Sequence, residues 1–345
     1  MNIVVLAGGL STERDVSITS GSMVAKALRQ KGHNVVFLDV FMGYEQDECD
    51  VKALFENGYD FTKDSKVSEN VPDLEQVRNM RRVKSDSYFG EHVEEICRFA
   101  DIVFLALHGG DGENGRLQAA LDLMGIKYTG SGYLASANAM NKGVTKSIFL
   151  DHKVGTPFGK CFRQKDNLDD FDIFPCVVKP CSGGSSVGVS IVEDKKDFVK
   201  AMDEAFKYET EVLVEQYIKG REFSVGVIDG KALPIIEIIP KSGFYDYVNK
   251  YQSGRTLEIC PAELDEETTR RMQKEAEKAY DALGLEAYGR IDFLLDKDGA
   301  LFALEANTLP GMTSASLIPQ EARANGIEYP DLCEMIVDVS MKKYL

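Results

Sequence analysis

The sequence has no tryptophan, only four histidines and no long apolar run. A helix that crosses a membrane needs about 20 consecutive apolar residues, and no segment approaches that length, so we expect no membrane partner. Basic residues are also in the minority, since 40 Lys and Arg against 56 Asp and Glu give a formal net charge of −16. This charge argues against general binding to nucleic acid or anionic membranes. Local cations and backbone N–H groups must therefore meet any anionic substrate.

Ordered cysteine patterns are lacking as well. The seven cysteines are scattered, and none forms a Cys-x-x-Cys pair. Neither a zinc site nor a disulfide framework is therefore indicated, and reduced thiols in a cytoplasm fit best. The amino terminus has no basic segment and no cleavage site of a secretion signal. We expect a cytoplasmic protein.

The beginning of the chain is typical of α/β nucleotide-binding folds. Residues 2–7, NIVVLA, predict a buried parallel strand. A glycine-rich loop and a helix that ends at Gly32 follow. Segments 33–40 and 100–115 predict two further strands, the second ending in a glycine-rich loop. The dinucleotide fingerprint G-x-G-x-x-G is absent from the first loop.

The rest of the chain requires more than one core, because 345 residues exceed what one small core holds. Residues 41–98 show little periodicity and predict short helices on a loop-rich excursion. Their basic cluster Arg78, Arg81, Arg82 and Lys84 is expected on a solvated helix face. The pattern changes near Ser136–Lys146, where we expect a domain boundary and a helix over 140–153.

The segment Tyr288–Ser316 predicts a hairpin with chemistry on one face. Its two apolar runs are separated by Asp298-Gly299, a strong hairpin signal. A two-residue loop there places Asp292 opposite Glu305 and Arg290 opposite Asn307, all on one face. A four-residue loop keeps this parity, whereas a three-residue loop would put the pairs on opposite faces. Two carboxylates and an amide suit Mg²⁺ or Mn²⁺; the alternative is a polar face that meets water, with Arg290 paired to a carboxylate.

Other candidate residues occur at strand ends and loops. Glu13 begins a helix, where it is either a favourable helix-terminal charge or a carboxylate that grips an ammonium group. His108 stands at the tip of a strand, where open α/β sheets bind ligands. The pattern of residues 174–192 is a strand, a Gly/Ser loop and a second strand. It predicts either a plain hairpin loop or a flap over phosphates, in which Lys179 supplies a point charge. The polar loop 242–256 is long enough to close over substrate.

These motifs together resemble a known family. AGGLSTERDVS, LALHGGDGENG, YTGSGYLASANAMNK, VVKPCSGGSSVGVS, EQYIKGREF, FYDYVNKY and RIDFLLDKDG…LEANTLPGMTSASL occur in the order found in D-alanine–D-alanine ligases of the ATP-grasp superfamily. The likeness spans almost the whole chain except about 41–98. It implies an α/β fold in which a Rossmann-like parallel sheet domain, 1–137, precedes two α+β subdomains, 138–219 and 220–345, that clasp ATP.

The resemblance also implies roles for matching positions. The residues implied in catalysis are Glu13, Ser185, Tyr251, Arg290, Gly311 and Ser316. Those implied in ATP binding are Lys146, Lys179, Ser185, Ser186, Glu215, Tyr217, Ile218, Glu222 and Lys250. Those implied in substrate binding are Glu13, His108, Arg290, Gly311, Ser316 and Leu317. The implied metal ligands are Asp292, Glu305 and Asn307.

The implied activity is ATP-dependent joining of two D-alanines through a D-alanyl phosphate, for peptidoglycan precursor synthesis. The implied cofactors are ATP and two Mg²⁺ or Mn²⁺ ions, and the implied assembly is a homodimer. Two alternatives stay open: a ligase of the same family that makes D-Ala–D-Ser or D-Ala–D-lactate, and a non-catalytic nucleotide-binding protein on the same fold. Tyr247, Lys250 and Tyr251 match the loop pattern of peptide-making members.

Overall fold

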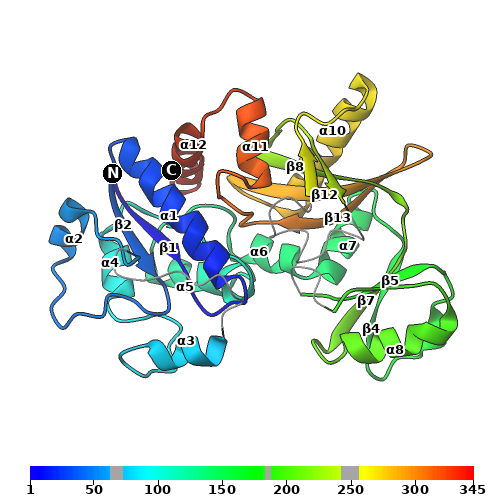
Figure 1. The fold of residues 1–345 in the computed structure, drawn as a ribbon, viewed down its shortest axis with the longest axis horizontal. Coiled ribbons are helices and arrows are strands. Elements are labelled where there is room, and N and C mark those ends of the chain that lie inside the picture. The colour runs from blue at the N-terminus through cyan, green and yellow to red at the C-terminus, as the bar shows by residue number, and fades with distance from the viewer. Residues whose placement is uncertain (63–72, 183–187, 242–255) are drawn as a thin grey trace.

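The protein is organised around three β-sheets. The computed structural model describes residues 1–62, 73–182, 188–241 and 256–345. Figure 1 shows an N-terminal lobe in blue and cyan, a green lobe around β4 to β7, and a third lobe in yellow and orange above them. One parallel sheet and two antiparallel sheets confirm the expected fold class. Within the described ranges, no helix is long and apolar enough to cross a membrane.

The N-terminal lobe contains the parallel sheet that the sequence predicts. Its strands are β1 (Asn2–Ala7), β2 (Asn34–Asp39) and β3 (Ile102–Leu105), in the order β2-β1-β3. Helix α1 (Arg14–Gln30) connects β1 to β2. Because β1 and β3 are parallel neighbours, the loops that follow them meet at one edge of the sheet.

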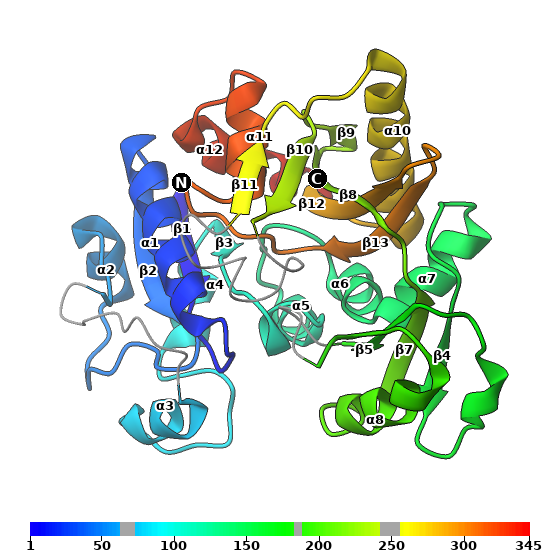
Figure 2. The same ribbon diagram turned by 45° about the vertical axis from the view of Figure 1, so that its right-hand side comes forward.

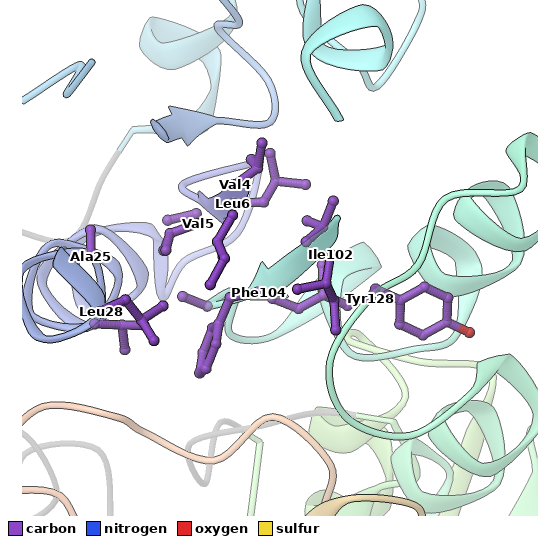
Figure 3. Close-up of a cluster of buried hydrophobic side chains, with 14 of the residues drawn as sticks. Val4, Val5, Leu6, Ala25, Leu28, Ile102, Phe104 and Tyr128 are labelled. Carbon is purple, nitrogen blue, oxygen red and sulfur yellow. The ribbon is translucent and has the colours of Figure 1, made fainter. Parts of the chain in front are cut away.

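Apolar side chains from sheet and helix form the core of this lobe. Val4 and Leu6 of β1, Phe104 of β3 and Leu28 of α1 are fully buried together (Figure 3). The strands read as nearly continuous apolar runs because a parallel sheet is covered on both faces. The lobe therefore forms a rigid base for the loops at its edge.

Outside residues 63–72, the excursion between β2 and β3 contains three short helices, and short helices were expected there. They are α2 (Val51–Asn57), α3 (Leu74–Met80) and α4 (Val93–Phe99). The prediction that its basic cluster forms a solvated helix face is wrong for Arg81, which follows α3 and is buried. The Arg81 guanidinium donates to the carbonyls of Ser85, Ser87 and Phe89. A guanidinium can be buried in this way because backbone carbonyls accept from both of its terminal nitrogens.

Three helices lead from the N-terminal lobe to the rest of the molecule. They are α5 (Arg116–Met124), α6 (Tyr133–Met140) and α7 (Lys142–Asp151). Asn141 separates the last two, and its Oδ1 accepts a hydrogen bond of 3.0 Å from Val144 N. An asparagine at this position caps the helix, so the predicted helix over 140–153 begins at Lys142.

The green lobe is a four-stranded antiparallel sheet covered by one helix. Its elements are β4 (Gly159–Arg163), β5 (Cys176–Pro180), β6 (Ser190–Val192), β7 (Glu211–Gln216) and α8 (Lys195–Ala205). The strand order is β4-β7-β5-β6. The core lies between the sheet and α8, with Phe198 and Met202 of the helix fully buried.

The third lobe is built on a larger antiparallel sheet. Its elements are β8 (Gly220–Ile228), β9 (Lys231–Ala232), β10 (Ile236–Pro240), β11 (Thr256–Ile259), α10 (Glu266–Leu283), β12 (Tyr288–Asp296) and β13 (Leu301–Asn307). The strand order is β11-β10-β8-β12-β13, and β9 pairs with β8. The sequence predicts helix α10 with Asp265 near its start and Gly284 just past its end. In the structure Asp265 caps the helix and Gly284 follows it in the left-handed region.

The last two helices are α11 (Leu317–Ala324) and α12 (Tyr329–Met341). The sequence predicts only the second, from about Asp331. Helix α12 contacts α1, and its Leu332 and Ile336 belong to the core of the N-terminal lobe. Figure 2 shows the red helix beside the blue one, so the first and the last α-helix of the chain pack together. The expected domain boundaries after residues 137 and 219 stay predictions.

Candidate active site

The β12–β13 hairpin places the expected residues opposite one another. Arg290 lies opposite Asn307, and Asp292 opposite Glu305. Directly opposite residues of antiparallel strands share one face of the sheet. The pairing predicted from the sequence is therefore confirmed.

The loop of this hairpin differs from the prediction of two residues. Asp296 N donates to Ala300 O at 3.0 Å, which leaves three residues, 297–299, in the loop, and Gly299 has φ +81°. A three-residue loop alone would put the polar pairs on opposite faces. A register shift between Asp292 and Phe293 inserts one extra residue on β13 and restores the parity. Two departures from the simple hairpin thus cancel.

Asp292 is the best-bonded carboxylate of the hairpin. Its Oδ1 accepts from Arg290 Nε at 2.9 Å and from Ser224 Oγ at 2.8 Å. Its Oδ2 accepts from Arg290 Nη2 at 2.8 Å and from Asn307 Nδ2 at 3.1 Å. The alternative prediction, a polar face that meets water, is wrong for Asp292, which is only 7% exposed. The pairing of Arg290 with a carboxylate, which belonged to that alternative, is present.

Glu305 is paired from outside the hairpin. Its Oε2 lies 3.3 Å from Lys142 Nζ, at the start of α7. Four residues later, Lys146 Nζ lies 2.6 Å from Glu215 Oε1 on β7. Residues four apart lie on the same face of a helix. Helix α7 therefore joins the hairpin to the green lobe through two lysines on one face.

The second of these lysines belongs to a compact charged cluster. Lys146, Lys179 and Glu215 are all buried, and Lys179 forms a short ion pair with Glu215 Oε2. Lys146 Nζ also donates to Thr156 Oγ1 at 2.9 Å and to Pro157 O. The contact of Lys146 with Glu215 Oε1 is close enough for an ion pair but does not have the angles of a hydrogen bond.

The cluster carries an excess of positive charge. Burial alone would raise the pKa of Glu215, but the ammonium groups of Lys179 and Lys146 outweigh burial and lower that pKa. Burial lowers the pKa of Lys146, and the carboxylate of Glu215 opposes this shift. Two lysines thus share one carboxylate, so the buried set favours an additional anionic group. Phosphate oxygens have the charge and the acceptor chemistry for this position.

His108 and Glu13 lie at the edge of the parallel sheet. His108 is buried; its Nδ1 lies 2.9 Å from Leu309 O and its Nε2 3.0 Å from Ser20 Oγ. A carbonyl only accepts, so Nδ1 carries the proton and Nε2 accepts from Ser20. Burial lowers the pKa of His108, and the nearby carboxylate of Glu13 partly opposes this. The neutral imidazole ties the N-terminal lobe to the segment after the hairpin.

Glu13 is the residue before α1, and its carboxylate approaches the loop after β3. A Cβ on Gly109 would lie 2.6 Å from Glu13 Oε2, and Gly109 has φ +67°. Only glycine therefore fits this close approach. Asp39 holds the loop after β1, since it accepts from Gly9 N at 3.4 Å and forms a buried ion pair with Arg14. This network fixes where α1, and with it Glu13, begins.

Glu113 is a site residue that the sequence analysis missed. Its Oε2 accepts from Gly109 N at 2.6 Å. Burial, with repulsion from Glu13, raises the pKa of Glu113 to about 7. Glu113 follows His108 by five residues inside a glycine-rich loop, and no sequence pattern distinguishes it from an ordinary surface acid.

Lys142 was missed as well, although its spacing of four from Lys146 is a visible signal.

The segment after the hairpin turns into α11. Ser316 is the residue before this helix, and its Oγ accepts from Thr313 N at 3.0 Å. A Cβ on Gly311 would lie 2.9 Å from Ser316 Oγ. The backbone of Gly311 is thus packed against Ser316, and Leu317 begins α11.

The other expected residues fall into two groups. Tyr217 and Ile218 directly follow β7, and Glu222 lies on β8; all three are half-buried. Tyr217 N donates to Pro175 O at 3.0 Å, which fixes this stretch beside β5. The remaining candidates lie outside the described residues: Ser185, Ser186, Lys250 and Tyr251.

Comparisons with known proteins agree with this architecture. Residues 2–131 match the family model described as D-ala D-ala ligase N-terminus, and residues 160–338 match the one described as D-ala D-ala ligase C-terminus. The D-alanine–D-alanine ligase of Pediococcus pentosaceus is 46% identical and aligns with 100% of this chain and 99% of the relative. That of Geotalea uraniireducens is 41% identical, with coverages of 99% and 96%.

Solved structures give the same result. Two crystal structures of D-alanine–D-alanine ligase from Bacillus anthracis cover 99% of this chain and 98% of their own. The structure complexed with ATP has a TM-score of 0.74 at 32% identity, and the other has 0.76 at 35%. The fold is thus that of an ATP-grasp protein. The chain belongs to the D-alanine–D-alanine ligase family.

Proposed function

We propose that this chain joins two D-alanine molecules to D-alanyl-D-alanine at the expense of ATP, as a step in making peptidoglycan precursors. The observation that carries the proposal is helix α7, whose Lys142 and Lys146 reach Glu305 of the hairpin and Glu215 of the green lobe. A phosphate-binding cluster and an acidic hairpin face are thereby held next to each other. Family membership supplies the substrates.

The nucleotide is held by the charged cluster and its neighbours. Lys146 and Lys179 contact phosphate oxygens, since their shared carboxylate leaves one positive charge in excess. Tyr217 and Ile218 line the adenine, and Glu222 accepts from the ribose hydroxyls. Ser185 and Ser186 cover the phosphates with Lys250; these three assignments rest on the family resemblance.

The first D-alanine is placed by the N-terminal lobe. The carboxylate of Glu13 grips its ammonium group, and the neutral His108 beside it holds the surrounding loop without adding positive charge. Transfer of the γ-phosphate of ATP to the D-alanine carboxylate gives an acyl phosphate and ADP. This turns a poor electrophile into one with a good leaving group.

The second D-alanine reacts at the hairpin. Its carboxylate is held at Ser316 and Leu317, and its free amine attacks the acyl phosphate. The tetrahedral intermediate carries an oxyanion, which Arg290 and the N–H of Gly311 stabilise. The family resemblance assigns Tyr251 and Ser185 a part in excluding water, which is needed because acyl phosphates hydrolyse. Phosphate then leaves and the peptide is released.

The hairpin residues fit a pair of Mg²⁺ or Mn²⁺ ions. Asp292, Glu305 and Asn307 offer carboxylate and amide oxygens on one face, the donor set that such hard cations prefer. Arg290 and Lys142 now balance the two carboxylates. When bound, the ions would neutralise charge on the transferring phosphate.

A product assay tests the activity. We expect ADP release that depends on D-alanine, and mass spectrometry should show D-alanyl-D-alanine as the main product when D-alanine, D-serine and D-lactate compete. ATP binding without D-alanine-dependent turnover would support the non-catalytic alternative. Dominant D-Ala–D-Ser or depsipeptide would change the acceptor and leave the ligase chemistry in place.

Location and assembly complete the proposal. A cytoplasmic location follows from the substrates, since ATP is a cytoplasmic metabolite and the cysteines are free thiols where the structure describes them. We also propose a homodimer, on the family resemblance alone. Light scattering during gel filtration would show twice the chain mass of 38.2 kDa if this is right.

A further inference from the structure

Two cysteine side chains meet beside the phosphate-binding lysines. Cys161 lies on β4 and Cys181 directly after β5, and their Sγ atoms are 3.8 Å apart. Cys161 and Lys179 both lie opposite Leu213 of the intervening strand β7. Directly opposite residues share a face, so the Cys161 thiol is on the same face of the sheet as the Lys179 ammonium group.

Helix α7 begins directly over this thiol pair. Lys142 N donates to Cys181 O at 2.8 Å. A Cβ on Gly143 would lie 2.3 Å from Cys161 Sγ and 3.7 Å from Cys181 Sγ. A glycine is therefore required at this point of the helix. The positive end of a helix stabilises a thiolate beside it, and α7 is the helix that also carries Lys146.

Cys161 differs from Cys181 and from the buried cysteines in the direction of its pKa shift. The hydrogen bond with Cys181 lowers the pKa of Cys161 against the effect of burial, and Lys146 contributes in the same direction. The same hydrogen bond and burial raise the pKa of Cys181. Burial raises the pKa to about 12 at Cys97 and Cys333. Of the two thiols, Cys161 is therefore the more acidic, and Cys181 lies within 3.8 Å of it.

The solvent exposure of the two cysteines fits a pair in which one is the nucleophile and the other reacts with its first product. Cys161 is half-buried, whereas Cys181 is fully buried behind it. Thiols that respond to oxidants are accessible, have a lowered pKa and often lie next to a second cysteine that resolves the first product. The pair meets each of these conditions.

We propose that Cys161 and Cys181 form an oxidant-reactive thiol pair, and that its closure to a disulfide by a hydroperoxide weakens nucleotide binding. The Cys161 thiolate attacks one peroxide oxygen, the O–O bond breaks, and the leaving alkoxide or hydroxide takes a proton. The Cys181 sulfur then loses its proton and attacks the sulfenic sulfur of Cys161, releasing water. In total, two thiols and one hydroperoxide give one disulfide, one alcohol or water, and one water.

Closure must disturb the nucleotide cluster. The sulfur atoms are 3.8 Å apart and a disulfide bond is about 2.05 Å, so they must approach by roughly 1.8 Å. Cys181 follows Lys179 by two residues, and its carbonyl holds the first turn of α7, where Lys142 lies. Misplacing such groups by about 1 Å can cost on the order of a hundredfold in rate. We expect ATP affinity to fall at least tenfold on oxidation, and to recover with dithiothreitol.

The first experiment tests the thiols without using ligase activity. The reduced protein is alkylated with a limiting amount of iodoacetamide and mapped by peptide mass spectrometry, before and after treatment with hydrogen peroxide. Cys161 should be alkylated before Cys97, Cys176 and Cys333, and peroxide should produce a peptide cross-linked between Cys161 and Cys181. Alkylation of Cys161 no faster than of the three buried cysteines, or a cross-link elsewhere, would overturn the proposal.

The second experiment tests the consequence, which rests on the proposed nucleotide site. ATP affinity is measured by calorimetry for the reduced and oxidised forms of the wild-type, C161S, C181S and C49S proteins. Cys49 lies in the N-terminal lobe and serves as the matched control. Wild-type and C49S should lose affinity with peroxide, and C161S and C181S should keep theirs. Equal loss in all four proteins contradicts the proposal, whereas absence of ATP binding in the reduced wild-type protein contradicts the proposed function instead.

Discussion

Two carboxylates organise the candidate site, and they are balanced differently. Glu215 is shared by Lys146 and Lys179, so its cluster has one positive charge in excess. On the hairpin, Asp292 is paired with Arg290 and Glu305 with Lys142, so these four residues together carry no net charge. The first arrangement attracts an anion directly. Under the proposed function, the second would bind phosphate through cations held by its carboxylates. The comparison therefore assigns nucleotide binding to the first set and chemistry to the second as a proposal.

The largest effect should come from breaking the neutral hairpin set. Glu305→Gln keeps the size of the side chain and removes its charge, so a hard cation loses a ligand. Turnover should fall by orders of magnitude, with the thermal unfolding midpoint within a few degrees of wild type. The control is Glu266→Gln, at an exposed position on α10. Near wild-type turnover of Glu305→Gln at ordinary Mg²⁺ concentrations would show that the metal assignment is wrong.

Removing a cation from the other cluster should affect binding first. Lys146→Met keeps the length of the side chain but leaves Glu215 with Lys179 alone, so the excess positive charge disappears. A hydrogen bond to a charged group contributes about 1.5–3 kcal/mol, so ATP affinity should fall on the order of ten- to a hundredfold. Calorimetric titration with ATP measures this. Lys160→Met, which removes an exposed ion pair with Asp170 in the same sheet, is the control and should bind ATP normally.

Glu13→Gln should lower affinity for the first D-alanine on the order of ten- to a hundredfold, since one charge-assisted hydrogen bond is lost. ATP affinity should stay nearly unchanged, because Glu13 lies at the edge of the parallel sheet and not in the lysine cluster. Steady-state kinetics with each substrate varied in turn separates the two. Equal loss for ATP and D-alanine would indicate that Glu13 only starts α1.

The sequence predicted the fold well where local signals agree with tertiary structure. The apolar runs of β1 to β3 and the caps of α10 are examples. The facing pairs of the hairpin were also predicted correctly, but from a two-residue loop. In the structure the loop has three residues, and a bulge on β13 restores the same pairing. Helix α11 was missed; it is short, and proline stands in its first turn. Arg81 was misplaced because burial of a charge depends on carbonyls brought close only by folding.

Within the site, the sequence could indicate residue types but not their pairing. Lys146 and Lys179 were expected to contact phosphate, and nothing local shows that both meet Glu215, since the three residues come from α7, β5 and β7. Glu113 and the thiol pair are invisible for the same reason. Their properties arise from burial and from neighbours distant in the chain.

The last prediction concerns stability rather than activity, and contrasts the pH dependence of Glu215 with that of Glu113. The folded-state pKa of Glu215 is lowered below its ordinary value of 4.5, so the stability it contributes is present above that pH and is lost as pH falls through the folded-state pKa. Glu113 behaves in the opposite way. Its pKa is raised from 4.5 to about 7, so its contribution is full below pH 4.5 and declines as pH rises to about 7.

Glu113→Gln should therefore flatten the pH dependence of stability between these values. One pKa unit corresponds to about 1.4 kcal/mol, so the raised pKa of Glu113 lowers the free energy of unfolding by up to about 3 kcal/mol at pH 7 relative to pH 4.5. Urea unfolding of both proteins at pH 5 and pH 7.5 measures this difference, and the change between the two pH values should be smaller for the variant. Glu286→Gln is the matched control, since no buried carboxyl is neutralised there. The same change with pH in wild type and variant would show that Glu113 is ionised in the folded protein, and its bond from Gly109 N would then be the whole of its contribution.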